Sequence, residues 1–125
     1  MSHFTTVAVQ ISDLEDLKAC LKEMGYTITD AKTVKGYMGN QPAQLVIQSS
    51  AGGYPIGFTK NSDGNFEIIA DWWGVKGTTE REFTSKLKRT YAEHKVAKFA
   101  TRNRYAVKKS VVNQETVIEL VRRIY

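Results

Sequence analysis

Side chains able to transfer a proton are few in this sequence. An imidazole ordinarily titrates near neutral pH, so a histidine such as His94 is a candidate acid or base. His94 lies beside Tyr91 on the apolar stripe of an expected helix, with no partner group apparent from the sequence. A hydrogen-bonded packing role is therefore the simpler interpretation, and we expect no catalytic residue.

Residues that could hold a metal or a nucleotide are equally sparse. His3 has no second ligand at helical His/Glu spacing and no cysteine pair near it. Cys20 is the sole cysteine and adjoins a leucine stripe, which indicates packing. The glycines between residues 36 and 53 are too irregularly spaced for a phosphate-binding loop. We expect no metal and no cofactor.

The stretch ADWWG, residues 70–74, contains two adjacent tryptophans. Successive residues of a strand point to opposite faces of a sheet. Trp72 shares its parity with Phe66, Ile68 and Ala70, so we expect Trp72 in the core. Trp73 must then face the other side of the sheet.

Trp73 shares that second face with Ile69 and Asp71. It is either covered by the loop after Gly74 or exposed as a contact residue, because large aromatics are common interface anchors. Asp71, beside two indoles, could have a raised pKa. A hydrogen bond to nearby backbone is the interpretation we favour. The candidate partner-binding residues are Trp73, Asp71 and Ile69.

The charge is distributed unevenly along the chain. Residues 1–75 hold 5 Lys/Arg against 8 Asp/Glu, a net −3, whereas residues 76–125 hold 13 against 5, a net +8. A basic half can attract phosphate backbones, anionic lipid or an acidic protein, or can be an ordinary solvated face. The candidate nucleic-acid contacts are Lys88, Arg89, Lys95, Lys108, Lys109, Arg122 and Arg123.

Length and composition favour one globular domain over residues 1–125. Hydrophobic residues make up 42% and charged residues 25%, far from the signature of disorder. The start, MSHFTTVAVQ, lacks the features of a signal peptide, and no apolar run approaches the length of a membrane span. We expect a cytoplasmic protein or one from an equivalent reducing compartment.

Local patterns predict the elements. Residues 3–11 alternate as a strand, and a helix over 13–25 follows, with Ser12 and Glu15 as a capping box and Gly25 as its stop. Strands are expected at 26–37, 44–49, 54–60 and 65–73, and an Asp63–Gly64 hairpin turn joins the last two.

A second helix begins near Thr78 or Thr79, where Thr79 and Glu82 form a capping box, and runs through residue 103. Its expected apolar stripe is Phe83, Leu87, Tyr91, His94 and Ala97. Residues 105–123 are expected to form two strands joined around 113–114, with a helix as the alternative for their final part.

This order, β-α-β-β-β-β-α-β-β, predicts an α+β domain with both helices on one face of a mostly antiparallel, twisted sheet. The other face would be partly polar or buried by a partner. A half-covered sheet of this kind is a recurrent binding platform, which is an argument by analogy.

Several stretches of the sequence resemble a known family: MSHFT, VKGYMGN, IGFTKNSDGNFEIIADWWG and YAEHKV. Together they are similar to the hypothetical chloroplast reading frame thirty-five family of cyanobacteria and algal plastids, over essentially the whole chain. The resemblance implies a soluble cyanobacterial or plastid-stroma protein. It supplies no activity and no catalytic residues.

Three functions remain open. The leading hypothesis is a non-enzymatic accessory or adaptor protein that binds a protein partner through the open sheet face near Trp73. The alternative is a nucleic-acid-binding module that uses the basic half, although no RNA-recognition aromatic motif is present. An enzyme ranks third, because no nucleophile, base and orienting group can be named.

Overall fold

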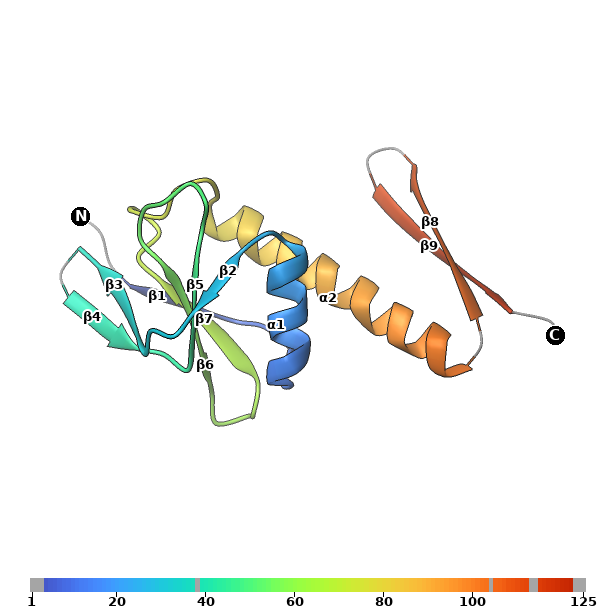
Figure 1. The fold of residues 1–125 in the computed structure, drawn as a ribbon, viewed down its shortest axis with the longest axis horizontal. Helices are drawn as coiled ribbons and strands as arrows, with labels where there is room; N and C mark the ends of the chain where they lie inside the picture. The colour runs from blue at the N-terminus through green and yellow to red at the C-terminus, as the bar shows by residue number, and fades with distance from the viewer. Residues whose placement is uncertain (1–3, 38, 104, 113–114, 123–125) are drawn as a thin grey trace.

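The computed structural model describes residues 4–37, 39–103, 105–112 and 115–122. Two helices and a series of short strands follow one another along the chain (Figure 1). In order, they are β1 Thr5–Ala8, α1 Leu14–Glu23, β2 Thr27–Thr29, β3 Thr33–Gly36, β4 Gly39–Pro42, β5 Leu45–Gln48, β6 Ile56–Lys60, β7 Phe66–Ala70, α2 Glu80–Asn103, β8 Tyr105–Val112 and β9 Glu115–Arg122.

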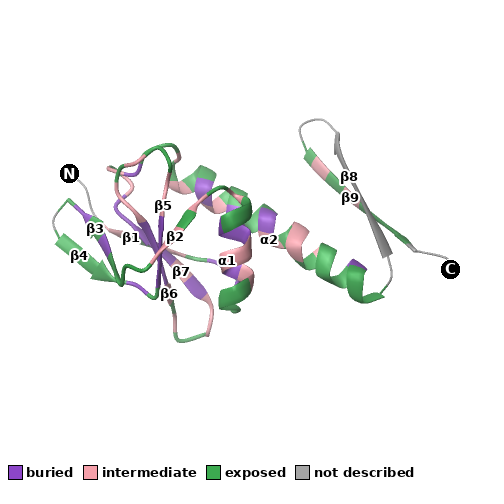
Figure 2. Ribbon diagram, viewed as in Figure 1, coloured by how far each residue is buried: buried purple, intermediate pink, exposed green. Residues whose placement is uncertain are grey.

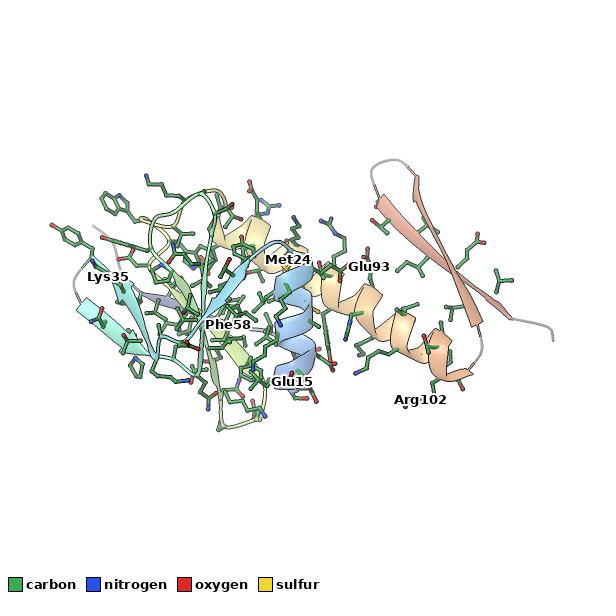
Figure 3. The ribbon with its side chains drawn as sticks, viewed as in Figure 1. Glu15, Met24, Lys35, Phe58, Glu93 and Arg102 are labelled. Carbon is green, nitrogen blue, oxygen red and sulfur yellow. The ribbon has the colours of Figure 1, made fainter. Side chains whose placement is uncertain are left out.

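The central sheet has five strands in the order β1-β7-β6-β5-β2, and every neighbouring pair is antiparallel. Both helices cover one face of it. Leu17 and Leu21 of α1 and Leu87 of α2 are fully buried in a core that includes Phe58 from β6. Figure 3 shows Phe58 among the side chains between the sheet and α1. The predicted α+β class, with two helices on one face of an antiparallel sheet, is confirmed.

The stretch between the helices contains two more strands than expected. Residues 26–37 form β2 and β3 instead of one strand, and the stretch between the expected strands at 26–37 and 44–49 contains β4. The residues of β4, GNQP, have neither β-branched nor aromatic side chains, so propensity gives no strand signal there. β4 is a strand because its backbone pairs with β3, from Thr33 opposite Pro42 to Gly36 opposite Gly39.

The β3–β4 hairpin covers part of the sheet face that was expected to be open. Val34 and Ala43 pack against Val46 and Ile69 in a second buried cluster. At Gly57 an added Cβ would overlap Val34 Cγ2, so the absence of a side chain there lets β3 approach the sheet. In Figure 2, β3 is partly buried and β4 is exposed. The expectation of an open second face is therefore wrong beneath this hairpin.

The turn and cap predictions hold with small shifts. Asp13, not Ser12, caps α1, since its side chain accepts the Asp16 N–H at 2.9 Å. Thr79 Oγ1 accepts the Glu82 N–H at 3.2 Å, which confirms the cap of α2. Gly64, at φ 81°, closes the β6–β7 hairpin.

Helix α2 continues past the sheet toward the β8–β9 hairpin, which follows it (Figure 1). Ala97, expected on the buried stripe of α2, is exposed, whereas Ala100 is buried. The buried side of α2 is therefore different in the part of the helix that extends beyond the sheet. The two predicted C-terminal strands are confirmed as β8 and β9, and the expected break at 113–114 lies outside the described residues.

Candidate functional site

The two tryptophans belong to a tight turn after β7. That strand ends at Ala70, three residues earlier than expected. The Gly74 N–H donates to the Asp71 carbonyl at 3.2 Å, and the Val75 N–H donates to the Trp72 carbonyl at 3.3 Å. A Cβ at Gly74 would overlap the ring of Tyr54. The turn is thus fixed by its own backbone bonds and by close packing.

Asp71 anchors this turn to the β3–β4 hairpin. Its side chain is only 1% exposed, and Oδ2 accepts the backbone N–H of Tyr37 at 3.0 Å. Oδ1 is also buried and accepts no hydrogen bond from the described residues. A Cβ at Gly36 would lie 2.6 Å from Phe4 Cζ and 3.0 Å from Asp71 Cβ, so the backbone approaches closely here. Asp71 does accept a backbone hydrogen bond, but the donor belongs to a distant loop, so the expectation of a nearby partner is wrong.

Trp72 and Trp73 separate as predicted, but the strand ends at Ala70, so the turn and not the alternation of a strand directs them apart. Trp72 packs against the main core, with its ring centroid 5.8 Å from that of Phe83. Trp73 is 72% exposed and stands edge-on to Tyr37, itself 59% exposed, with centroids 6.0 Å apart and planes at 69°. We call Trp73 and Tyr37 the aromatic pair. The sequence did not indicate that Tyr37 would join Trp73, because a distant contact decides it.

The three candidate partner-binding residues do not form one accessible surface. Trp73 is exposed, but Ile69 is 8% exposed and packs beneath Val34, and Asp71 is buried. A partner could touch Ile69 or Asp71 only if the β3–β4 hairpin moved. The expectation that Ile69 and Asp71 are contact residues is therefore corrected. Asp71 instead holds the backbone of Tyr37, one member of the aromatic pair.

The basic candidates are divided among different surfaces. Lys88 and Lys95 line one groove, and Lys95 Nζ lies 5.4 Å from the centroid of the Tyr91 ring. Arg89 lines a different cavity, together with Glu93 of α2 and Glu115 of β9. Lys108 and Lys109 belong to β8 and Arg122 to β9, but their side chains, like the whole of Arg123, lie outside the described residues.

His94 takes part in a link between the two helices. Its Nε2 lies 3.2 Å from Asp16 Oδ1, and Lys98 Nζ donates to the same oxygen at 2.7 Å. The hydrogen bond from Lys98 lowers the pKa of Asp16 below its ordinary value, although burial opposes the shift. The same bond raises the pKa of Lys98. The hydrogen-bonded role expected for His94 is confirmed.

The profile of a family described as "Protein of unknown function (DUF1257)" matches residues 20–121. The chain belongs to this family. It is also 27% identical, over 124 residues, to "Uncharacterized protein ycf35" of Guillardia theta, covering 96% of this chain and 94% of that protein. The resemblance inferred from the sequence is thereby confirmed. No solved structure matches the chain.

The DUF1257 match contains the aromatic pair, Asp71 and both lysines of the groove, whereas β1 and Asp16 precede it. Cys20, where the match begins, is fully buried, and burial raises the pKa of its thiol to about 11. That environment disfavours the reactive thiolate. Among the described residues no helix is both long and apolar enough to cross a membrane, and none of their His, Cys, Asp and Glu side chains form a group of three or more suited to a metal.

Proposed function

We propose that this protein is a non-enzymatic accessory or adaptor module that binds a protein partner through the aromatic pair. The observation that carries the proposal is the exposure of Trp73 and Tyr37 side by side, on a turn held by a buried carboxylate. Large exposed aromatics are expensive to leave in water and are enriched among residues that dominate binding energy.

The support beneath the pair favours binding over a purely structural role. The Asp71–Tyr37 hydrogen bond fixes the backbone of one ring, and the 71–74 turn fixes the other. A contact surface that is already ordered loses less conformational entropy when a partner arrives. Neither ring is needed to fill the core, since Trp72 and Phe83 already pack there.

Nucleic acid is the second candidate ligand. The observation in its favour is that Lys88 and Lys95 border Tyr91, a combination of charge and aromatic surface that single strands use. Against it, Arg89 lies apart from these lysines and next to acidic residues. An enzyme is the third candidate. For compartment, we propose the cytoplasm or the plastid stroma.

The test is affinity capture from a cyanobacterial extract with tagged wild-type protein, Trp73→Ala and Tyr37→Ala, each with and without nuclease. We expect both variants to fold and to lose one defined partner, and the wild-type protein to retain it after nuclease. Phe99→Ala, which removes another exposed aromatic ring, is the matched control and should keep the partner. Capture that persists in both ring variants, or that nuclease abolishes, contradicts the proposal.

A further inference from the structure

The outer edge of the central sheet, formed by β1, has backbone groups that could pair with a further strand. β1 is an edge strand, and the N–H of Val9, directly after it, donates to the Phe66 carbonyl at 3.0 Å. Residues alternate along an antiparallel ladder between those that bond the neighbouring strand and those that point away. Thr6 and Ala8 therefore direct their N–H and C=O groups to the outer side of β1, and both residues are exposed. Such an edge can pair with another extended chain.

A basic groove adjoins the C-terminal end of this edge. Its volume is about 530 Å³, and Lys88 and Lys95 both border it. They are seven positions apart on α2, which corresponds to about 10.5 Å along the helix. The lining residues are Ala8, Gln10, Ile11, Lys88, Tyr91, Ala92 and Lys95. Among the residues that the structure describes, no carboxylate lines the groove, so none of them neutralises its charge from within.

We propose that β1 accepts an extended acidic segment of a partner protein as an added strand, with Lys88 and Lys95 pairing with carboxylates of that segment. Backbone groups of Thr6 and Ala8 supply the hydrogen bonds of the new ladder. The lysines select an acidic sequence, since alternate side chains of an added strand point toward the same side.

The edge favours a peptide over a nucleic acid as the occupant. A strand edge offers donors and acceptors at the repeat of a polypeptide, and a sugar–phosphate chain cannot continue that ladder. This interaction is separate from the aromatic pair. Thr5 is opposite Ala70, at the end of β7 from which the 71–74 turn leads, whereas the groove adjoins Ala8 at the other end of β1.

The probe is a blocked seven-residue peptide in which glutamate alternates with valine, titrated into the full chain by calorimetry and by amide chemical shifts. Two control peptides replace either every glutamate by lysine or every valine by proline. We expect binding of the first peptide alone, with shifts at Thr6 and Ala8. Proline in place of valine preserves the charge of the peptide, but it removes the N–H of every second residue and restricts the backbone.

Two protein variants separate charge from pairing. Lys88→Glu combined with Lys95→Glu should weaken binding about tenfold or more, whereas Lys22→Glu combined with Lys86→Glu, which changes the net charge equally outside the groove, should leave it unchanged. Ala8→Pro removes an outward N–H that β7 does not use, and should also weaken binding about tenfold or more. Ala8→Ser keeps that N–H and should bind as the wild type does.

Three results overturn the proposal: no binding of the acidic peptide at about 1 mM, equal losses in both lysine pairs, or full binding by a folded Ala8→Pro variant. If Ala8→Pro does not fold, equal binding of the proline-containing peptide overturns it instead. A ten-nucleotide oligothymidylate that binds more tightly than the peptide, and that depends on Lys88 and Lys95 but not on Ala8, assigns the groove to nucleic acid. Trp73→Ala should bind the peptide normally, so failure here leaves the role of the aromatic pair intact.

Discussion

The Asp71 carboxylate accepts the backbone N–H of Tyr37 at 3.0 Å, across 34 positions of sequence. This bond joins the loop after β3 to the turn after β7. It also fixes the backbone of Tyr37 close to the turn that carries Trp73, whose ring Tyr37 contacts. A buried acidic side chain therefore helps to hold an exposed pair of aromatic rings in place.

Replacing Asp71 should destabilise the protein according to how well the new side chain accepts a hydrogen bond. Asp71→Ala leaves the Tyr37 N–H without its acceptor and should lower the free energy of unfolding by about 1–3 kcal/mol. Asp71→Asn keeps a carbonyl oxygen at the site and should cost less. Urea titration measures both. Equal losses would show that the negative charge of the side chain, and not its acceptor oxygen, matters, because both substitutions remove the charge.

The adjacent tryptophans should respond oppositely to truncation. Trp72→Ala removes a ring packed against Phe83 and should cost about 3 kcal/mol, the lower end for a large aromatic because Trp72 is only partly buried. Trp73→Ala should stay within about 1 kcal/mol, as at a surface position. Denaturant titration of the two variants side by side is the measurement. A large loss at Trp73 would mean that the aromatic pair is part of the stabilising structure.

Features of the fold that depend on a few neighbouring residues could be predicted from the sequence. The cap at Thr79 and the Asp63–Gly64 hairpin turn both follow from residue preferences within a few positions. The helix over residues 80–103 followed from the same signals. The separation of Trp72 and Trp73 was predicted from the alternation of a strand, but the strand ends before them at Ala70.

Long-range contacts decided the rest. The β3–β4 hairpin folds over Ile69 because Gly57 leaves space for Val34, and no pattern within the hairpin announces that packing. The Asp71–Tyr37 bond and the Asp16–Lys98 pair span 34 and 82 positions. A single sequence contains no signal for such partners, so the surface around Trp73 could be predicted only in part.

Gly57 should be intolerant of even one added methyl group. In Gly57→Ala the new Cβ would overlap Val34 Cγ2 and lie 3.0 Å from Ala43 Cβ, so β3 must shift outward. We expect a loss of about 1–3 kcal/mol, the usual cost of overpacking. Val34→Ala in the same chain should recover part of it, and a double-mutant cycle of unfolding free energies measures the coupling. Strict additivity would contradict this packing of the hairpin.

The Asp16 carboxylate, which joins α1 to His94 and Lys98 of α2, should make stability depend on acidic pH. Its pKa is lowered from 3.8 in the folded chain, so the folded state binds its proton less readily than the unfolded state. That difference stabilises the protein above pH 3.8 and is lost as the pH falls through the folded pKa. Asp16→Asn should therefore be less stable than wild type near neutral pH, and the gap should close in acid.

Glu15→Gln is the matched control for this pH effect. Glu15 also lies in the first turn of α1, but it is exposed, and its ion pair within the described part of the chain is with the neighbouring Lys18 at 3.7 Å. Both substitutions remove the same charge from the same helix end, so both lose the same kind of interaction with the helix dipole. Urea titrations at several pH values between about 3 and 7 should give a larger, more pH-dependent loss for Asp16→Asn. Identical profiles would assign the effect to the helix dipole and would leave the contact between α1 and α2 without an electrostatic contribution from Asp16.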